Sequence, residues 1–217
     1  MKVASMTSID TAGLKTMFDA IAVAIEVDKD RLCQLDGVIG DADHGIAMAL
    51  GFGAVRDALA PLDLSATEPT ALLNTAAKSF LNAVGASSGP LYATAFMRGA
   101  AAVKGRATLA GADFIALFQA MAQGIQDRGK AEIGEKTMVD AWLPAAQAAT
   151  AAHAAGKTLS ESLAAALEAA ERGAEATKDM IAAKGRSSRL GERSLGHVDP
   201  GAASAVTVIG AMRKSLA

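Results

Sequence analysis

The stretch Leu14–Ile25, LKTMFDAIAVAI, contains the pattern that decides the fold. Its apolar side chains recur at intervals of three and four residues, which places them on one face of an α-helix. The same spacing returns in Leu73–Val84, Phe114–Ile125 and Ala205–Met212. No segment has the period-two alternation rich in β-branched residues that is typical of strands. The sequence therefore predicts an all-α fold without a sheet.

Turn and cap residues divide this pattern into about eight helices, joined as an up-and-down bundle. Thr158 and Glu161 have the spacing of a capping box, and Thr137 with Asp140 is a weaker version. Ser88-Gly89-Pro90 and Asp199-Pro200-Gly201 each place a cap residue and a proline where a helix begins. We expect one domain over residues 1–217, with helices over residues 8–28, 44–60, 68–84, 89–104, 111–128, 137–154, 159–183 and 200–215.

Composition limits the classes of function. Of the 217 residues, 51% are hydrophobic and 20% are charged, so the chain can bury a large core. The net charge of −2 gives no electrostatic reason to expect nucleic acid or an anionic membrane as a partner. Cys33 is the single cysteine, and no apolar run has the length of a membrane span. We expect a cytoplasmic protein, with Cys33 as a buried small residue rather than a nucleophile.

The connections between helices are the candidates for a functional site. In an up-and-down bundle every second connection lies at the same end. The connections after the first, third, fifth and seventh expected helices should therefore meet. They cover residues 31–43, 85–90, 129–136 and 185–200, and all of them contain glycine.

The first of these connections contains LDGVIGDADHG, Leu35–Gly45. Asp36, Asp41 and Asp43 lie within eight residues of one another, and carboxylates this close repel unless a cation lies between them. Mg²⁺ prefers oxygen ligands and commonly bridges carboxylates to phosphates. One interpretation is a magnesium site that holds a nucleotide. The other is a solvated acidic turn that precedes a helix.

Other metal and phosphate motifs fit less well. Counting from Asp41, an EF-hand would need acidic or amide residues where Gly45 and Phe52 stand. The three histidines have no ligand spacing for zinc. The third connection, GKAEIGEKTM, lacks a P-loop because Glu135 stands where that motif requires lysine.

The second and fourth connections favour phosphate. GASSGP, Gly85–Pro90, is rich in hydroxyl groups and precedes a helix, whose free N–H groups and dipole attract anions. Gly185–Gly201 contains Arg186, Arg189 and Arg193, and the arginine side chain binds phosphate through its planar fork of donors. Taken singly, an ordinary capped turn and a solvated basic loop remain open. Together the connections offer what phosphoryl transfer needs, which is positioning and neutralisation of charge.

Four motifs resemble a known family. LDGVIGDADHG, GASSGPLYATAF, GEKTMVDAW and GRSSRLGERSLGHVDPGAAS are similar, in this order, to motifs of the nucleotide-binding L subunit of dihydroxyacetone kinases. The resemblance covers nearly the whole chain. It implies a barrel of eight antiparallel helices with ADP or ATP at one rim, and a phosphotransferase that uses an alcohol group as acceptor.

The resemblance also implies site residues. Asp36, Asp41 and Asp43 match the family's magnesium ligands, which hold two Mg²⁺ ions against the phosphates. Met138 and Gly129 match positions that border the base. The full set of positions that match nucleotide contacts is His44, Gly45, Ser87, Ser88, Gly129, Met138, Arg186, Asp199, Pro200 and Gly201.

The chain departs from the family pattern at a few positions. Ala42 stands where glycine is usual, and Ile46 with Ala47 replaces a polar pair, so Ala47 cannot supply the phosphate or metal contact of an asparagine. Ser87 replaces a usual alanine. These changes leave metal binding in place and bear on nucleotide affinity.

In this family a separate K subunit binds the hydroxyketone covalently, so the resemblance implies a partner chain. The phosphate donor is then either ATP or a phosphotransferase-system protein that rephosphorylates resident ADP. Two alternatives from other classes are a nucleotide-loaded regulatory adaptor without turnover and a carrier of an apolar ligand inside the bundle.

Overall fold

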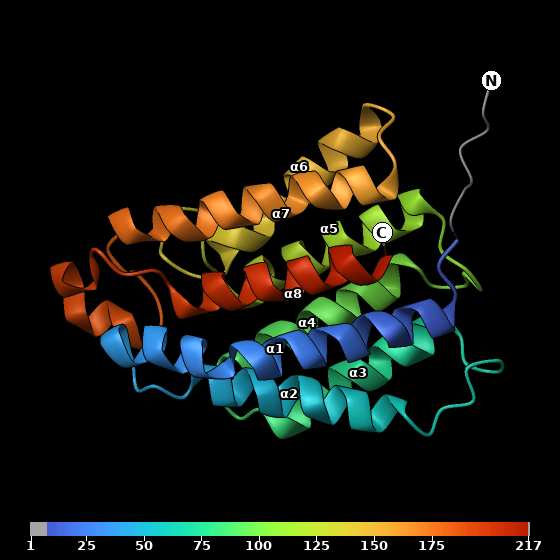
Figure 1. Cartoon of the computed structure of the whole chain (residues 1–217), viewed down its shortest axis with the longest axis horizontal. Helices are drawn as coiled ribbons and strands as arrows, with labels where there is room; N and C mark the ends of the chain where they lie inside the picture. The colour runs from blue at the N-terminus through green and yellow to red at the C-terminus, as the bar shows by residue number, and fades with distance from the viewer. Residues whose placement is uncertain (1–7, 217) are drawn as a thin grey trace.

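The computed structural model describes residues 8–216, so the ends of the expected 1–217 domain lie outside it. Within this range the chain forms eight α-helices and two short 3₁₀ segments, η1 and η2 (Figure 1). The α-helices are α1 (Thr11–Ile39), α2 (His44–Leu59), α3 (Pro69–Ala83), α4 (Ser88–Ala102), α5 (Gly111–Gly129), α6 (Val139–Ala154), α7 (Leu159–Ala176) and α8 (Pro200–Leu216). The 3₁₀ segments are η1 (Thr177–Asp179) and η2 (Arg186–Ser194). The predicted all-α, eight-helix architecture is confirmed for the part of the chain that the structure describes.

The helices form a closed ring. Each packs against the next in sequence, and α1 also packs against α8, which joins the first helix to the last (Figure 1). At this junction the Thr207 hydroxyl of α8 donates to the Asp28 carboxylate of α1 at 2.6 Å. Between residues 8 and 216 the backbone forms only an isolated bridge, Ile9 to Leu109, and no strand. The prediction of no sheet therefore holds for these residues.

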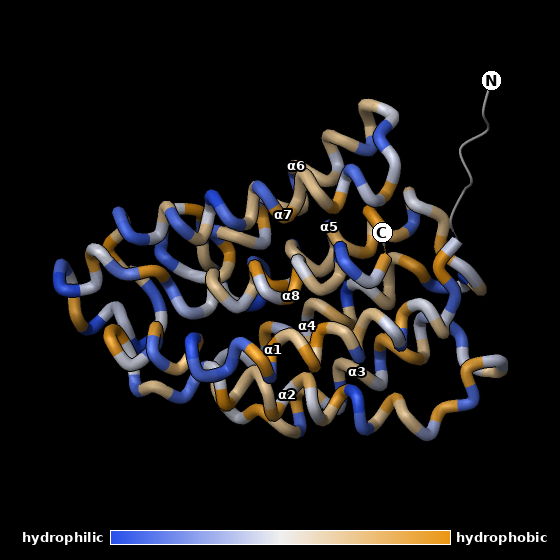
Figure 2. The backbone as a smooth tube through the Cα atoms, viewed as in Figure 1, coloured by the Kyte–Doolittle hydropathy of each residue, from blue (hydrophilic) through white to orange (hydrophobic). Residues whose placement is uncertain are grey.

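Apolar side chains from every α-helix fill the middle of the ring. The hydropathy colouring shows orange segments along the inner faces of the helices and blue segments mostly at the ends and the outside (Figure 2). Aromatic rings from α2, α3, α4 and α6 pack edge to face, with centroids 5.1 Å apart for Phe52 and Phe80 and 6.2 Å apart for Tyr92 and Trp142. Gly51 lets α2 approach this group, because a Cβ atom there would lie 2.4 Å from the Phe80 ring.

The expected ends of the first and seventh helices were wrong. α1 continues to Ile39 instead of ending near residue 28, because Leu32, Asp36 and Ile39 extend its buried face. The expected helix-free segment 31–43 thus shrinks to residues 40–43. α7 ends at Ala176 instead of residue 183, because the Thr177 hydroxyl turns back to donate to the Ala174 carbonyl at 2.6 Å.

Two further boundary details differ from the sequence prediction. Residues 186–194 of the expected helix-free segment 185–200 form η2, which Gly191 interrupts with non-helical backbone angles. α4 begins at Ser88, one residue before the expected start at residue 89, so Ser88 is the first helical residue instead of the cap; the N-cap, Ser87, makes no side-chain cap hydrogen bond. The expected serine cap at this helix is therefore absent.

The expected caps of α7 and α8 are present, whereas at α6 only the Asp140 half of the expected box forms and the N-cap is Met138. At α7 the Thr158 hydroxyl accepts from Glu161 N at 3.2 Å, and the Glu161 carboxylate accepts from Thr158 N at 2.8 Å. The Asp140 carboxylate accepts from Thr137 N at 2.7 Å ahead of α6. At α8 the Asp199 carboxylate accepts from Ala202 N at 2.8 Å.

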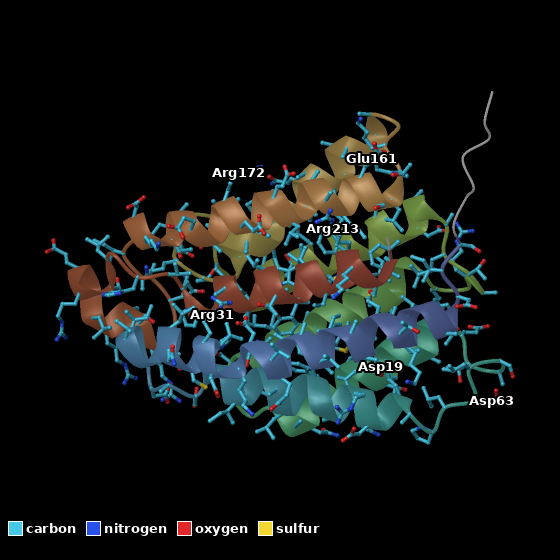
Figure 3. The ribbon with its side chains drawn as sticks, in the orientation of Figure 1. Asp19, Arg31, Asp63, Glu161, Arg172 and Arg213 are labelled. Atoms are coloured by element: carbon cyan, nitrogen blue, oxygen red, sulfur yellow. The ribbon has the colours of Figure 1, made fainter. Side chains whose placement is uncertain are left out.

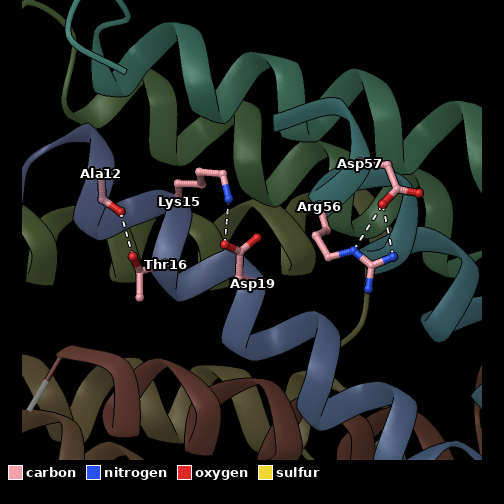
Figure 4. Close-up of polar contacts among 6 residues, drawn as sticks. All are labelled: Ala12, Lys15, Thr16, Asp19, Arg56 and Asp57. Atoms are coloured by element: carbon pink, nitrogen blue, oxygen red, sulfur yellow. Dashed lines mark hydrogen bonds and ion pairs between the residues drawn. The ribbon is translucent and has the colours of Figure 1, made fainter. Parts of the chain in front are cut away.

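Most charged side chains lie on the outside of the ring, as the labelled residues do (Figure 3). Lys15 pairs with Asp19 on α1 at 2.6 Å, and Arg56 pairs with Asp57 on α2 at 3.0 Å (Figure 4). Exposed pairs of this kind contribute little to stability, roughly 0–1 kcal/mol each. Among residues 8–216, none of the helices combines the length and the apolar character that a membrane crossing requires.

Candidate nucleotide and metal site

A cavity of about 640 Å³ lies at one end of the ring. Its walls come from the connections that follow α1, α3, α5 and α7, together with the helix ends beside them. The inference from the parity of the connections is therefore confirmed: these segments, distant in sequence, meet around one cavity. In Figure 1 this is the end at which η2 lies.

Three carboxylates converge on the cavity wall. Asp36 lies in the last turn of α1, and Asp41 and Asp43 lie in the connection to α2. One carboxylate oxygen from each of the three lies within 4.8 Å of the other two. Asp36 also shapes the connection, because its Oδ2 atom accepts from Asp43 N at 2.9 Å and from His44 N at 3.2 Å.

Gly40 allows this turn to close. The Gly40 N–H donates to the Asp36 carbonyl at 2.5 Å, and a Cβ atom at position 40 would lie 2.2 Å from Asp36 Oδ1. Any larger residue would therefore push the carboxylate of Asp36 out of place. The glycine is required for the close approach of the chain to a candidate metal ligand.

The electrostatics of the trio favour a bound cation. Burial, and after it the neighbouring charges of Asp41 and Asp36, raises the pKa of Asp43 above its usual value. Arg186 at the start of η2 partly offsets this charge by an ion pair with Asp41. Three oxygen donors that repel one another, two of them exposed, match the ligand preference of Mg²⁺. The residues present therefore fit this ion.

Helix N-termini face the same cavity. His44, Ser88 and Pro200 are the first residues of α2, α4 and α8, and all of them line it. The free N–H groups and the dipole at such ends attract anions. Lys184, Arg186 and Arg189 add positive charge from the connection between α7 and α8. The cavity thus combines an acidic cation site with groups suited to phosphate.

Two buried ionisable side chains, Lys136 and Asp199, also line the cavity. Burial raises the pKa of Asp199 to about 7, against the influence of the Ala202 N–H and of Lys136. Lys136 is 1% exposed, and its amine donates to the carbonyls of Thr177 and His197. Burial lowers the pKa of Lys136. This lysine ties the connection before α6 to the connection before α8.

The sequence matches the DAK2 domain family over residues 38–214. The chain belongs to the DAK2 domain family. The match begins beside the acidic turn and ends within α8, so it includes all of the connections that line the cavity.

Relatives within the DAK2 family are named for nucleotide binding. The ADP-binding subunit DhaL of the PEP-dependent dihydroxyacetone kinase of Escherichia coli is 40% identical over 82% of this chain and 83% of that protein. The corresponding subunit of dihydroxyacetone kinase 2 of Listeria innocua is 35% identical over 96% of each chain. The chain also matches about a third of larger enzymes: the L-erythrulose 1-kinase of Mycolicibacterium smegmatis is 36% identical over 86% of this chain and 32% of that enzyme.

The fold has a solved counterpart. The dihydroxyacetone kinase of C. freundii, in complex with AMP-PNP and Mg²⁺, superposes with a TM-score of 0.73 at 22% identity. The alignment covers 99% of this chain and 36% of that chain. This likeness shows that the chain shares the fold of that part of the kinase.

Nearly all residues that the sequence predicted for the site line the cavity. They are Asp36, Asp41, Asp43, His44, Ser87, Ser88, Gly129, Met138, Arg186, Asp199, Pro200 and Gly201. Gly45 is the exception. A Cβ atom there would lie 2.0 Å from the Lys29 carbonyl and 2.9 Å from Cys33 Sγ, so this glycine lets α2 pack on α1. Cys33 itself is half-buried.

The departures from the DAK2 pattern have visible consequences. Ala42 has a φ of 62°, the left-handed region in which glycine is favoured. Ala47 lines the cavity with a methyl group, whereas Ile46 is 51% exposed. Ala42 thus strains the acidic turn, and Ala47 presents an apolar methyl group to the cavity.

Sequence reasoning missed Lys136. Lys136 lies outside the segments with helical periodicity. The test for a P-loop motif in this connection depended on Glu135, the residue before it. The remaining signal was a lysine between the glycine-rich part of a connection and the start of a helix. Only the fold brings the carbonyls of Thr177 and His197 to its amine.

Proposed function

We propose that this chain is the nucleotide-binding subunit of a dihydroxyacetone-type kinase. It holds ADP or ATP with Mg²⁺, and phosphate passes to a small hydroxyketone on a separate K-type subunit. The observation that carries the proposal is the convergence of Asp36, Asp41 and Asp43, with oxygens within 4.8 Å, on a cavity of a DAK2 domain. We treat residues 1–217 as one such domain.

Each group has a role in this proposal. Asp36, Asp41 and Asp43 hold Mg²⁺, which when bound neutralises phosphate charge. Ser87 and Ser88, where α4 begins, offer N–H groups and hydroxyls to phosphate oxygens. Gly129 and Met138 border the base, where a thioether packs well against a flat ring. No side chain of this subunit acts as nucleophile or base.

Arg186 contributes positive charge to the phosphates. Its guanidinium already reaches Asp41 across 145 positions of sequence. A polyphosphate in the cavity would offer the same guanidinium oxygen acceptors with more negative charge. The connection that contains η2 would then lie against the nucleotide as well as the acidic turn.

The phosphate donor is the finer part of the proposal. The relatives that match along most of their length are PEP-dependent or PTS-dependent kinase subunits named for ADP. We infer from this that ADP stays bound and is rephosphorylated by a phosphotransferase-system protein. Assays with the K-type partner, comparing ATP with that protein as donor, distinguish the two modes. Formation of no sugar phosphate with either donor would favour a regulatory adaptor.

Calorimetry with ADP and Mg²⁺ tests the site itself. Asp41→Asn removes one charge from the trio, and the matched control Asp57→Asn removes one from the surface of α2, where Asp57 pairs with Arg56 (Figure 4). We expect the wild type and Asp57→Asn to bind equally, and Asp41→Asn to bind at least 10-fold more weakly, about 1.4 kcal/mol. Equal binding by all three proteins, or by none, would overturn the proposal.

A further inference from the structure

His44, which lines the cavity, contacts Ser204, which lies behind the cavity wall, although 160 positions separate them. We infer that Ser204 is a positioning residue: it holds the His44 ring by Nε2, so that Nδ1 is the nitrogen left to face a nucleotide as a hydrogen-bond acceptor. The inference deepens the proposed function and rests on it for the identity of the ligand. The contact between the two side chains does not depend on that identity.

The two side chains have few other arrangements open to them. The His44 backbone N–H donates to Asp36 at 3.2 Å, which fixes the first residue of α2 against the acidic turn. Its ring Nε2 lies 2.9 Å from Ser204 Oγ. Ser204 lies on the inner face of α8 and is fully buried, so water does not compete for its hydroxyl. The hydrogen bond between the two groups therefore fixes the orientation of the His44 ring relative to α8.

The hydrogen bond from Ser204 to the Gly201 carbonyl of its own helix points to one tautomer of His44. Ser204 has one hydroxyl proton, and its Oγ lies 2.9 Å from the Gly201 carbonyl, which can only accept. A proton donated to Gly201 leaves Oγ as the acceptor for His44, so Nε2 must carry a hydrogen. In the neutral ring Nδ1 then carries none and accepts. The alternative, in which Ser204 donates to Nε2, leaves the Gly201 carbonyl without this bond.

This arrangement links two parts of the cavity wall. Gly201 and Asp199 belong to the start of α8, and His44 begins α2; all three line the cavity. Ser204 joins them through a chain from the imidazole N–H to the hydroxyl and on to the carbonyl. An Nδ1 acceptor selects a hydroxyl or N–H group on the ligand rather than a phosphate oxygen. His44 thus complements the anion-binding helix ends instead of duplicating them.

Nitrogen NMR of histidine-labelled protein tests the tautomer directly. The chain has three histidines, and the variants His153→Gln and His197→Gln assign the remaining signals to His44. At about pH 8, above the usual pKa of imidazole, we expect a protonated Nε2 and an unprotonated Nδ1 in the wild type without nucleotide. A wild-type spectrum with the proton on Nδ1 would overturn the inference without any variant.

Ser204→Ala tests the positioning role, and Ser162→Ala is its matched control. Ser162 is also fully buried, and its hydroxyl likewise donates to a backbone carbonyl of its own helix, at 2.8 Å, but it contacts no histidine. We expect Ser204→Ala to convert His44 to a mixture of tautomers and to weaken binding of ADP with Mg²⁺ by about 2- to 12-fold, the range of one hydrogen bond. Ser162→Ala should change neither measurement.

The two proposals fail in different ways. If the wild type binds no ADP with Mg²⁺, the proposed function falls, while the NMR measurement still tests the contact. If the wild type binds ADP but Ser204→Ala matches Ser162→Ala in tautomer and affinity, the positioning role falls and the proposed function stands.

Discussion

At the scale of single residues, the acidic turn places a strained backbone conformation between two candidate metal ligands. Asp41, Ala42 and Asp43 are consecutive, and the turn must present both carboxylates to the same point. Ala42 meets this requirement with a φ of 62°. For a residue with a Cβ atom this conformation costs roughly 1–2 kcal/mol. The strain therefore lies between two candidate metal ligands.

Replacing Ala42 with glycine should relieve this strain. We expect Ala42→Gly to raise the free energy of unfolding by about 0.5–1 kcal/mol, because the relief exceeds the extra entropy of glycine in the unfolded chain. Urea denaturation measures the change. The control is Ala60→Gly at the end of α2, where φ is −58°; there glycine should lower the free energy of unfolding by a similar amount. Destabilisation by both variants would show that Ala42 is not strained.

Individual residues were predictable where their chemistry is local. Asp36, Asp41 and Asp43 were predictable as a cluster because they lie within eight residues in a stretch whose glycines allow the chain to turn. Lys136 was not predictable in this way, since its carbonyl partners at Thr177 and His197 come from a connection 41 to 61 positions away. The hydrogen bond between Ser204 and His44 was not predictable either, because 160 positions separate the two residues.

At the scale of elements, the contact between α6 and α7 depends on the absence of a side chain. A Cβ atom at Gly173 would lie 1.9 Å from the Asp140 carbonyl, on the first turn of α6. That carbonyl has no helical donor, because Pro144 stands four residues later and lacks an N–H. The side chain of Asp140 in turn holds the connection before α6, accepting from Gly134 N at 2.6 Å and Thr137 N at 2.7 Å.

Gly173→Ala should therefore separate two helices and disturb the cavity. We expect a loss of about 1–3 kcal/mol in the free energy of unfolding, the range for overpacking, despite the better helix propensity of alanine. The matched control is Gly53→Ala on α2, where a Cβ atom would have nothing within 4 Å; it should gain about 0.5–1 kcal/mol. Denaturation in urea compares them. A gain for both variants would refute the close contact.

The start of a helix was predictable from the sequence where the residues of an N-cap stand at the required spacing. Thr158 with Glu161 and Asp199 at α8 marked helix starts that the structure reproduces. The end of α1 was missed because residues 31–43 were expected to be free of helix, whereas Leu32 and Ile39 are buried and the helix continues through Gly37. Tertiary burial here outweighs the roughly 1 kcal/mol helix penalty of one glycine.

At the scale of the whole molecule, connectivity alone places the site. Because α1 to α8 alternate in direction around a closed ring, odd-numbered connections gather at one end and even-numbered ones at the other (Figure 1). The sequence could predict this from the number of helices. Helix number and periodicity alone could not predict that α1 packs against α8, since closure depends on how all eight helices tilt and pack; only the family resemblance implied a barrel.

Hydrogen exchange can test this division of the molecule. Mg²⁺ with ADP should slow amide exchange in residues 40–43, 84–87, 130–138 and 184–199, the connections that line the cavity, because a bound ligand must be released before they open. The opposite connections, residues 60–68, 103–110 and 155–158, serve as the internal control and should exchange as before. Asp41→Asn should lose the protection at the cavity end. Equal slowing at both ends would indicate stabilisation of the whole ring, and slowing confined to the opposite end would move the ligand away from the carboxylate trio.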